Sequence, residues 1–492
     1  MNALMSRMFA NALLLTVAHG AGAVHLDPGG RGQVLIYPYY SAQEGTQTLL
    51  SIVNHQNAGK AVKLRLREAR NGREVATLNI YLAEFDVWSA ALFMAPDGAP
   101  GLLTEDTTCS VPEVRTSSTL PRLPNGRRYL PLSNERYTGA MLDGGPTALS
   151  RAAVGHIEVI EMGSLVDNSD SDIHATPVNG VPVGCRALVS AWEDTGSPGY
   201  WRANPAVDLL PPTGGLSGTV TLLKIGDGTA WSLPVTAIDG FSVVQQHSAP
   251  NAVTPDLSSA VTETARIKVE SSVLFKGRLL RSEWPQARAI DAVSAVLAQG
   301  TIRAEYSNEA AIGARTDWVL TLPTRRFYSD PAITAVALAP FTVLHDRPQR
   351  CEVVRPQPYN RESTRPLDFI GFPGVSEPGT CICDTSQVLP FGGEVDPAAL
   401  LATLCQQNPL PTILSGFLLD AGFFALHLER NGHRSRPALG GETYAGLPIL
   451  GFTLQSYRNA AARPGEIGVY SVARPHSGDV HCERDGVACV TR

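Results

Sequence analysis

The sequence predicts an all-β protein whose antiparallel sheets form one large sandwich or two packed, immunoglobulin-like sandwiches, with one or two accessory helices. Of its 492 residues only 17% are charged, against about 25% in typical domains, and turn formers are common, with 45 Gly and 36 Pro. Residues 32–93 contain several strand-length apolar runs separated by turn residues. In one run, Val62, Leu64 and Leu66 alternate with Lys63, Arg65 and Arg67. This period of two predicts a strand with one apolar face and one charged face in water.

The N-terminal segment has the features of a secretory signal peptide. Arg7 provides a basic region, residues 8–18 form an apolar run, and residues 21–23 (Ala-Gly-Ala) fit a small-residue cleavage site. The apolar run is too short to cross a bilayer, which takes about 20 residues. We therefore expect residues 1–23 to be removed and the mature chain to begin at Val24, with no transmembrane span. The predicted location is the periplasm, the outer membrane surface or the medium.

Residues 24–262 are predicted to form the first β region, a sandwich interrupted by long loops. Asn71 and Gly72 lie between two strand patterns, and both tolerate positive φ, so they predict a tight type I′ hairpin. Residues 96–131 are rich in Pro, Ser and Thr and indicate a long surface loop. Residues 155–162 have the composition of a strand.

Residues 263–462 are predicted to form a second β region that contains a helix. The helix is expected at residues 284–299, because Pro285 suits a first turn and an apolar stripe follows it. Further elements are expected at residues 317–322 and 333–344 (strands), 397–406 (helix), 413–428 (two strands) and 447–454 (strand). The second region either forms its own sandwich or shares a sheet with the first. Residues 463–492 are predicted to be a polar C-terminal tail.

Eight cysteines in an exported chain predict disulfide bonds. Cys482 and Cys489 are close enough in sequence to close a small loop, and Cys109 and Cys185 both flank the first β region. The other four cysteines are expected to pair among themselves; they are Cys351, Cys381, Cys383 and Cys405. A metal or redox pair at Cys-Ile-Cys is the alternative, which the spacing disfavours because metal sites usually separate two cysteines by two to four residues.

Two sets of polar side chains are candidates for a catalytic or metal site. His156 and Glu158 lie on one face of a predicted strand, where they could serve acid–base chemistry or hold a metal; a solvated strand face is the alternative. Asn168, Asp170 and Asp172 alternate like the oxygen ligands of a calcium loop. The Gly and Glu that an EF-hand needs later in its loop are missing, so the alternatives are an irregular calcium site and a plain polar loop.

Aromatic residues near the N-terminus could form a binding platform. Tyr37 and Tyr39 share one face of a predicted strand, and with Tyr81 and Trp88 they could stack on a sugar or a peptide. Large aromatic side chains are more often part of a core. We therefore expect Trp88 in the core.

Eight segments of the chain match the sequence pattern of other proteins. Among them are Gly-Gln-Val-Leu-Ile-Tyr-Pro-Tyr-Tyr and Thr-Asp-Trp-Val-Leu-Thr-Leu-Pro-Thr-Arg-Arg-Phe-Tyr. They are residues 25–40, 48–54, 70–74, 86–88, 155–161, 212–215, 316–328 and 446–451. Through them the chain resembles a family of exported, β-rich proteobacterial proteins to which no activity is assigned. The resemblance spans most of the mature chain. It implies export and a shared fold, and it implies no activity, ligand or catalytic residue.

Export, a β scaffold and the lack of a complete catalytic motif favour a binding role over catalysis. A formal net charge of −6 gives no reason to expect nucleic acid, and no complete catalytic or cofactor motif occurs, so no cofactor is expected. We expect a non-catalytic envelope or secreted protein, an adhesion or binding module whose partner is a cell surface, a glycan or a protein. The alternative is an exported hydrolase whose site is built from loops, since such residues converge only in three dimensions. Clustered Asp, Glu and His in a deep pocket would favour the enzyme, and a shallow aromatic surface would favour binding.

Overall fold

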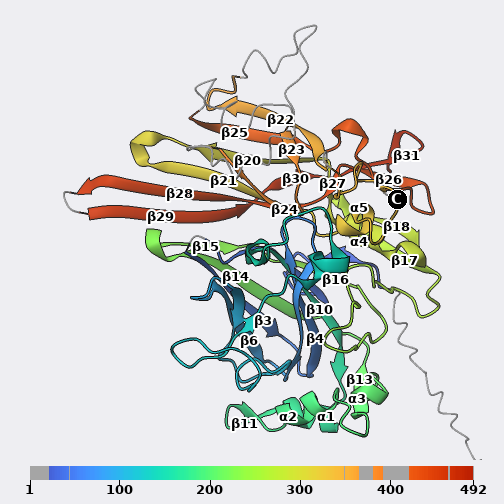
Figure 1. Ribbon diagram of the computed structural model, residues 1–492. Helices are drawn as coiled ribbons and strands as arrows, with labels where there is room; N and C mark the ends of the chain where they lie inside the picture. Colours follow the sequence, from blue (N-terminus) through green and yellow to red (C-terminus); the bar gives the residue numbers. More distant parts are fainter. Residues whose placement is uncertain are drawn as a thin grey trace, which may run out of the picture.

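The computed structural model describes residues 22–43, 45–347, 350–364, 380–391, 420–463 and 466–490, and it confirms the all-β prediction (Figure 1). Within these residues the first β region is a sandwich of two sheets. The larger sheet has eight strands, in the order β1-β16-β2-β10-β4-β5-β8 with β13 beside β10, and the smaller has six, in the order β15-β14-β3-β6-β7-β9. The larger sheet contains β1 (His25–Leu26), β2 (Val34–Ser41), β4 (Lys60–Glu68), β5 (Glu74–Leu82), β8 (Cys109–Val111), β10 (Val154–Leu165), β13 (Leu209–Leu210) and β16 (Thr236–Asp239). The smaller sheet contains β3 (Thr46–Asn54), β6 (Val87–Met94), β7 (Pro100–Leu103), β9 (Leu130–Pro131), β14 (Leu216–Lys224) and β15 (Thr229–Leu233).

Apolar side chains from both sheets fill the space between them. Leu64 and Ile157 of the larger sheet and Ile52 and Trp88 of the smaller sheet are fully buried in one cluster. Because side chains alternate along each strand, every second residue contributes to this core. Trp88 lies in the core, as expected.

The second β region consists of smaller sheets, drawn in yellow to red in Figure 1. A five-stranded sheet has the order β23-β22-β25-β20-β30, a four-stranded sheet has the order β24-β21-β28-β29, and β26-β31-β32, β17-β18 and β19-β27 form smaller sheets in the described part of the chain. The strands are β17 (Lys268–Phe275), β18 (Arg278–Pro285), β19 (Ala298–Gln299), β20 (Thr301–Ser307), β21 (Ala314–Thr321), β22 (Glu352–Asn360), β23 (Thr380–Ile382), β24 (Ser386–Pro390), β25 (Ala421–His427), β26 (Glu442–Ala445), β27 (Leu447–Pro448), β28 (Leu450–Arg463), β29 (Glu466–Pro475), β30 (Ser477–Asp479), β31 (His481–Arg484) and β32 (Val487–Ala488). Two helices, α4 (Ala289–Leu297) and α5 (Arg326–Ser329), pack among them.

The start of the described chain links the two regions. The N–H of Val24 donates to the carbonyl of Glu270 on β17, and the carbonyl of Val24 accepts from the N–H of Ser272, both at 2.8 Å. The next two residues form β1, which pairs with β16. Residues 24–26 therefore connect the β17–β18 hairpin to the larger sheet of the first region.

The two regions also share an apolar core. Val34 and Ile36 of β2 belong to the same buried cluster as Trp284 at the end of β18 and Trp318 of β21. Strand β2 is therefore buried on both faces, with its other side chains in the sandwich core. A strand buried on both faces explains why residues 34–37 are continuously apolar.

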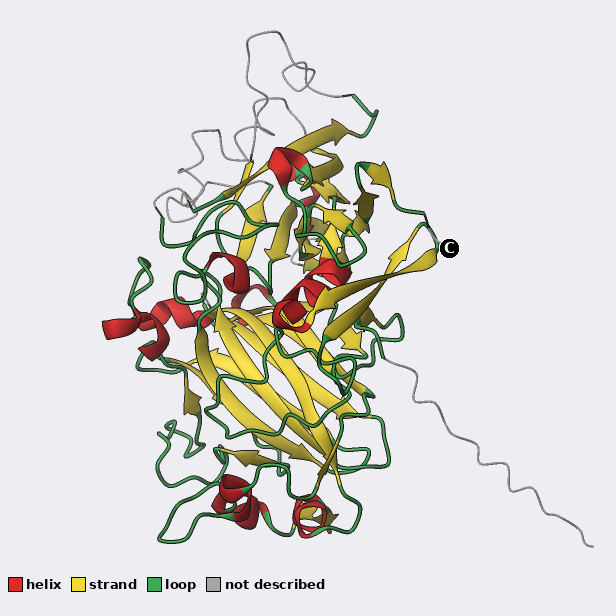
Figure 2. Cartoon of the chain, turned by 90° about the vertical axis from the view of Figure 1, so that its right-hand side faces the viewer, coloured by secondary structure: helices red, strands yellow, loops and turns green. Residues whose placement is uncertain are grey.

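Short helices cover one end of the sandwich. They are α1 (Asp170–Ala175), α2 (Cys185–Ser190) and α3 (Tyr200–Ala203), with a small hairpin of β11 (Pro177–Val178) and β12 (Val181–Pro182) between α1 and α2. Figure 2 shows these helices at the end of the broad, twisted sheet. None of the helices in the described ranges is long and apolar enough to cross a membrane.

The charged face of β4 is buried, which corrects the prediction of a wet face. Lys63 and Arg65 are fully buried and Arg67 is 2% exposed. A period of two shows that the faces of a strand differ in polarity, and it does not show that the polar face meets water. Here carbonyls of residues 249–255 bind Lys63 and Arg65, and Glu158 of the neighbouring strand pairs with Arg67.

The β4–β5 hairpin is present, but its turn is not the predicted type I′ turn. The loop spans residues 69–73, and Gly72 has a φ of 69° whereas Asn71 is outside the left-handed region. The Glu68 carboxylate accepts three backbone N–H groups of this loop at 2.7, 3.0 and 2.9 Å. This carboxylate stabilises a wider loop than Asn-Gly alone would form.

Some expected elements of the second region differ in extent. Helix α4 begins at Ala289, because Trp284 and Pro285 still belong to β18, an edge strand on which proline is tolerated. Residues 333–344 form turns and irregular structure, since Pro340 interrupts the run. The expected helix at residues 397–406 lies outside the described residues. The polar segment after residue 463 contributes strands, because β29, β30 and β31 pair with β28, β20 and β26.

Candidate functional site

His156 and Glu158 lie on β10, on the face of the larger sheet that points away from the sandwich core. The register places His156 opposite Arg67 of β4. Glu158 Oε1 lies 2.7 Å from Nε of Arg67 and 3.6 Å from Nε2 of His156. Burial raises the pKa of Glu158, but Arg67 and His156 outweigh burial and hold the pKa at about 2.

This arrangement is a buried ion pair. The side chains of His156 and Glu158 are both 0% exposed. A general base must reach a substrate proton, and it works best when its pKa lies near the working pH. Because Glu158 is sealed from solvent and stays ionised against Arg67, we assign both residues to the contact between β4 and β10.

Backbone carbonyls of a distant segment bind two further cations of β4. Lys63 Nζ donates to the carbonyl of Ala249 at 2.7 Å. Arg65 donates from Nη2 to the carbonyl of Ala252 at 2.7 Å and from Nε to that of Pro255 at 2.9 Å. Burial, together with nearby Arg65, lowers the pKa of Lys63 to about 7. The charged face of β4 therefore holds this segment on the sheet.

A second buried network joins the β4–β5 turn to the second region. Arg151 binds Glu68 (Nε–Oε2, 2.9 Å) and Asp143 (Nη2–Oδ2, 2.5 Å). Arg73 Nη2 lies 2.8 Å from Oδ1 of Asp330, which follows α5. Burial raises the pKa of Asp143, but Arg151 outweighs burial and the pKa falls to about 2. These contacts fix the relative position of the two β regions.

Asn168, Asp170 and Asp172 lie at the start of α1. Ser169 caps this helix by accepting a hydrogen bond from the N–H of Asp172 at 3.2 Å, and Asp172 Oδ2 accepts one from the N–H of Asn168 at 3.2 Å. Acidic residues in a first turn also complement the helix dipole. Among the described residues, no group of three or more His, Cys, Asp or Glu side chains is placed to hold a metal ion.

Tyr37 and Tyr39 belong to the sandwich core. Tyr37 is fully buried and its hydroxyl donates to the carbonyl of Ser51 at 2.6 Å, while Tyr39 is 8% exposed. Both rings pack in the cluster that contains Trp88. They therefore present no face to a ligand.

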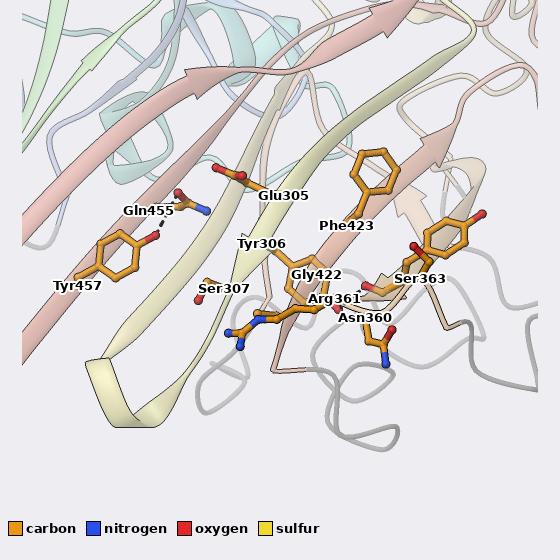
Figure 3. A pocket seen from close by; sticks show the side chains of 12 residues that line it. Glu305, Tyr306, Ser307, Asn360, Arg361, Ser363, Gly422, Phe423, Gln455 and Tyr457 are labelled. Carbon is orange, nitrogen blue, oxygen red and sulfur yellow. Dashed lines mark hydrogen bonds between the residues drawn. The ribbon is translucent and has the colours of Figure 1, made fainter.

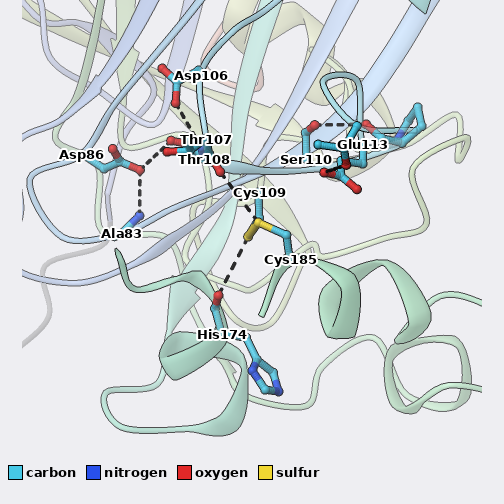
Figure 4. The surroundings of a disulfide bond; sticks show 12 residues. Ala83, Asp86, Asp106, Thr107, Thr108, Cys109, Ser110, Glu113, His174 and Cys185 are labelled. Carbon is cyan, nitrogen blue, oxygen red and sulfur yellow. Dashed lines mark hydrogen bonds between the residues drawn. A yellow bond between two sulfur atoms is a disulfide. The ribbon is translucent and has the colours of Figure 1, made fainter. Parts of the chain in front are cut away.

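The structure contains both disulfides that the spacing predicted. Cys109 of β8 is bonded to Cys185 of α2, with Cα atoms 4.9 Å apart, and Figure 4 shows this link between the sheet edge and the covering helices. Cys482 is bonded to Cys489. In the remaining group Cys351 is bonded to Cys383 and Cys381 is also in a disulfide, while Cys405 lies outside the described residues.

An open hollow of about 620 Å³ is lined by residues of β20, β22 and β25 in the five-stranded sheet and by residues of β28 in the four-stranded sheet (Figure 3). The register places Tyr359 of β22 opposite Phe423 of β25, and Phe423 opposite Glu305 of β20, so these side chains share one face. The rings of Tyr359 and Phe423 are 6.1 Å apart. Tyr306 and Gly422 also line the hollow, and they are paired with each other across the same two strands. The hollow therefore has an aromatic wall on a rigid sheet.

Polar side chains also line the hollow. Asn360, Arg361, Gln455 and Tyr457 line the hollow, and the Tyr457 hydroxyl donates to Oε1 of Gln455 at 3.4 Å. Glu305 is the carboxylate among the described lining residues, and it is paired with an arginine of β29. Histidine is missing from the same described lining. The hollow can thus stack on a ligand and hydrogen-bond to it, and Glu305 is the acidic residue in its described lining.

Comparison of the chain with family models, with curated proteins and with solved structures gives no match.

Sequence reasoning missed this hollow. Its aromatic residues come from strands that are far apart in the chain, and Phe423 lies in an apolar run that does not distinguish the two faces of its strand. Alternation alone marks an outer face but does not indicate which outer faces meet.

Proposed function

We propose that this chain is an exported, non-catalytic protein that binds a glycan in the hollow over β20, β22 and β25. Its disulfides support export, because such bonds persist in oxidising compartments. The signal-like segment at residues 1–23 and the resemblance to exported, β-rich proteins support the same location.

The composition of the hollow carries this proposal. A sugar ring presents C–H groups on its faces and hydroxyl groups around its edge, so it needs an aromatic surface next to hydrogen-bonding groups. Phe423, which is 40% exposed, and Tyr359 provide the surface, and the side chains of Asn360, Arg361 and Gln455 provide the hydrogen bonds. The volume of about 620 Å³ is within the usual range for small-ligand sites.

The alternative function, an exported hydrolase, has less support from the same residues. Most glycosidases need two carboxyl groups about 5–9.5 Å apart across the scissile bond. The described lining offers Glu305 alone, and Arg474 neutralises it. Binding without cleavage therefore fits the hollow better.

Binding to a panel of bacterial and host-derived oligosaccharides tests the proposal. Mature protein should bind at least one of them in a glycan array, with affinity confirmed by calorimetry. Phe423→Ala should weaken that binding at least tenfold, since it removes half of the aromatic wall. Phe85→Ala is the matched control, because Phe85 is 63% exposed in the β5–β6 turn and does not line the hollow.

Two outcomes would overturn glycan binding in the hollow. One is that no oligosaccharide binds, and the other is that both phenylalanine variants bind as tightly as the unchanged protein. Release of new reducing ends from a bound oligosaccharide would instead establish the hydrolase alternative.

A further inference from the structure

The β17–β18 hairpin ends in a tight turn that is exposed to solvent. Lys276 and Gly277 form the turn with φ of 49° and 78°, the left-handed values of a two-residue type I′ turn. The register pairs Leu274 directly with Leu279 next to this turn. The hairpin lies on the side of the molecule that faces the viewer in Figure 2.

The two faces of this hairpin have different surroundings. Val273, Phe275 and Leu280 point into the shared core and are at most 7% exposed. On the opposite face Leu274 and Leu279 are 65% and 64% exposed. The core contacts of one face hold the backbone in place, so the two leucines form a fixed apolar tip.

The charged residues of the tip itself are all positive. Lys276, Arg278 and Arg281 are exposed, and residues 273–281 contain no Asp or Glu. The acidic residues of the hairpin lie at its base, where Lys268 pairs with both Glu270 and Glu283. The chain as a whole is acidic, with a formal net charge of −6, so this tip is a local cationic site.

We propose that the β17–β18 tip is a docking site for an anionic phospholipid bilayer. Exposed leucines enter the boundary between headgroups and acyl chains, and cations next to them bind the anionic headgroups. The leucine pair suits the boundary with the acyl chains, and the three flanking cations suit the anionic headgroups. In this docked state the hairpin lies on the membrane surface and does not cross the bilayer. This site is separate from the glycan hollow and does not depend on it.

Vesicle flotation tests the docking site. The mature protein should float with vesicles of phosphatidylcholine and phosphatidylglycerol at low salt, and it should not float with pure phosphatidylcholine. Binding should decrease at higher salt, because exposed charges are screened. Changing Lys276, Arg278 and Arg281 together to Gln should lower the partition coefficient by roughly 100-fold. Replacing both Leu274 and Leu279 with Ser should lower it about tenfold or more.

The small β11–β12 hairpin supplies the matched control. Val178 and Val181 are paired across its strands and are 56% and 50% exposed. Their double change to Ser should leave flotation unchanged. All three variants alter surface side chains. A melting temperature equal to that of the unchanged protein will establish that each variant is folded.

Three results would overturn the proposal. They are no flotation with anionic vesicles at low salt, equal flotation with neutral and anionic vesicles, and equal binding by the leucine variant and the valine control. Glycan binding is measured without vesicles. A failure of vesicle flotation therefore does not count against glycan binding in the hollow.

Discussion

Replacing Glu158 with Gln measures how much the buried charges stabilise the larger sheet. The variant keeps the size of the side chain but leaves Arg67 buried without its carboxylate. Breaking one side of a buried ion pair costs about 3–5 kcal/mol. The pKa of Glu158 gives a similar figure, because its fall from 4.5 to about 2 corresponds to about 3 kcal/mol at about 1.4 kcal/mol per unit. We expect Glu158→Gln to lose about 3 kcal/mol of unfolding free energy at pH 7.

The effect of Glu158 depends on pH in a defined direction. Its pKa in the folded protein lies below the unfolded value of 4.5, so its contribution is fully present above pH 4.5 and is lost as the pH falls towards 2. The unchanged protein should therefore lose stability over this range more steeply than the variant.

Urea unfolding between pH 7 and pH 2 provides the measurement, and Glu305→Gln provides the control. Glu305 also pairs with an arginine, Arg474, but both side chains are 58% exposed. Exposed pairs contribute about 0–1 kcal/mol, so the control should remain close to the unchanged protein. The reasoning is refuted if the two Gln variants lose equal stability at pH 7, or if Glu158→Gln keeps the full acid dependence.

The core, the disulfides and the N-terminus give three further predictions. Trp88→Ala removes a fully buried indole and should cost about 3–5 kcal/mol, seen as a much lower melting temperature; an unchanged melt would contradict its core position. Replacing Cys109 and Cys185 with Ser should cost about 2–4 kcal/mol, and peptide mapping without reduction should recover these two cysteines linked, whereas free thiols would exclude the pair. N-terminal sequencing of protein from its native host should begin at Val24, and a chain that begins at Met1 would rule out cleavage.

Local patterns in the sequence were sufficient for many of the strands and for the Cys482–Cys489 disulfide. The alternation in residues 61–67 predicted β4, because the period of side chains along a strand is a property of the backbone alone. The short separation of Cys482 and Cys489 similarly limits their partners. The all-β class followed from many such short segments, each of which is specified within about ten residues.

Only the tertiary structure decided what the polar residues do. Lys63, Arg65 and Glu158 have the sequence pattern of a solvated face. Yet carbonyls of a segment nearly 190 residues later bind Lys63 and Arg65, and Glu158 is buried against Arg67. Their burial depends on partners that no local pattern can indicate, because a charge is stable inside a protein only when distant groups compensate it.

The candidate binding hollow depends on tertiary structure in the same way. Glu305, Tyr359 and Phe423 lie on three strands, and the apolar run around Phe423 does not show by itself which of its side chains face outward. The pairing of those strands places the three side chains side by side. The sequence by itself determined which segments are strands and which faces differ in polarity. The order and register of the strands decided which faces are buried and which form a site, because both depend on contacts between residues far apart in the chain.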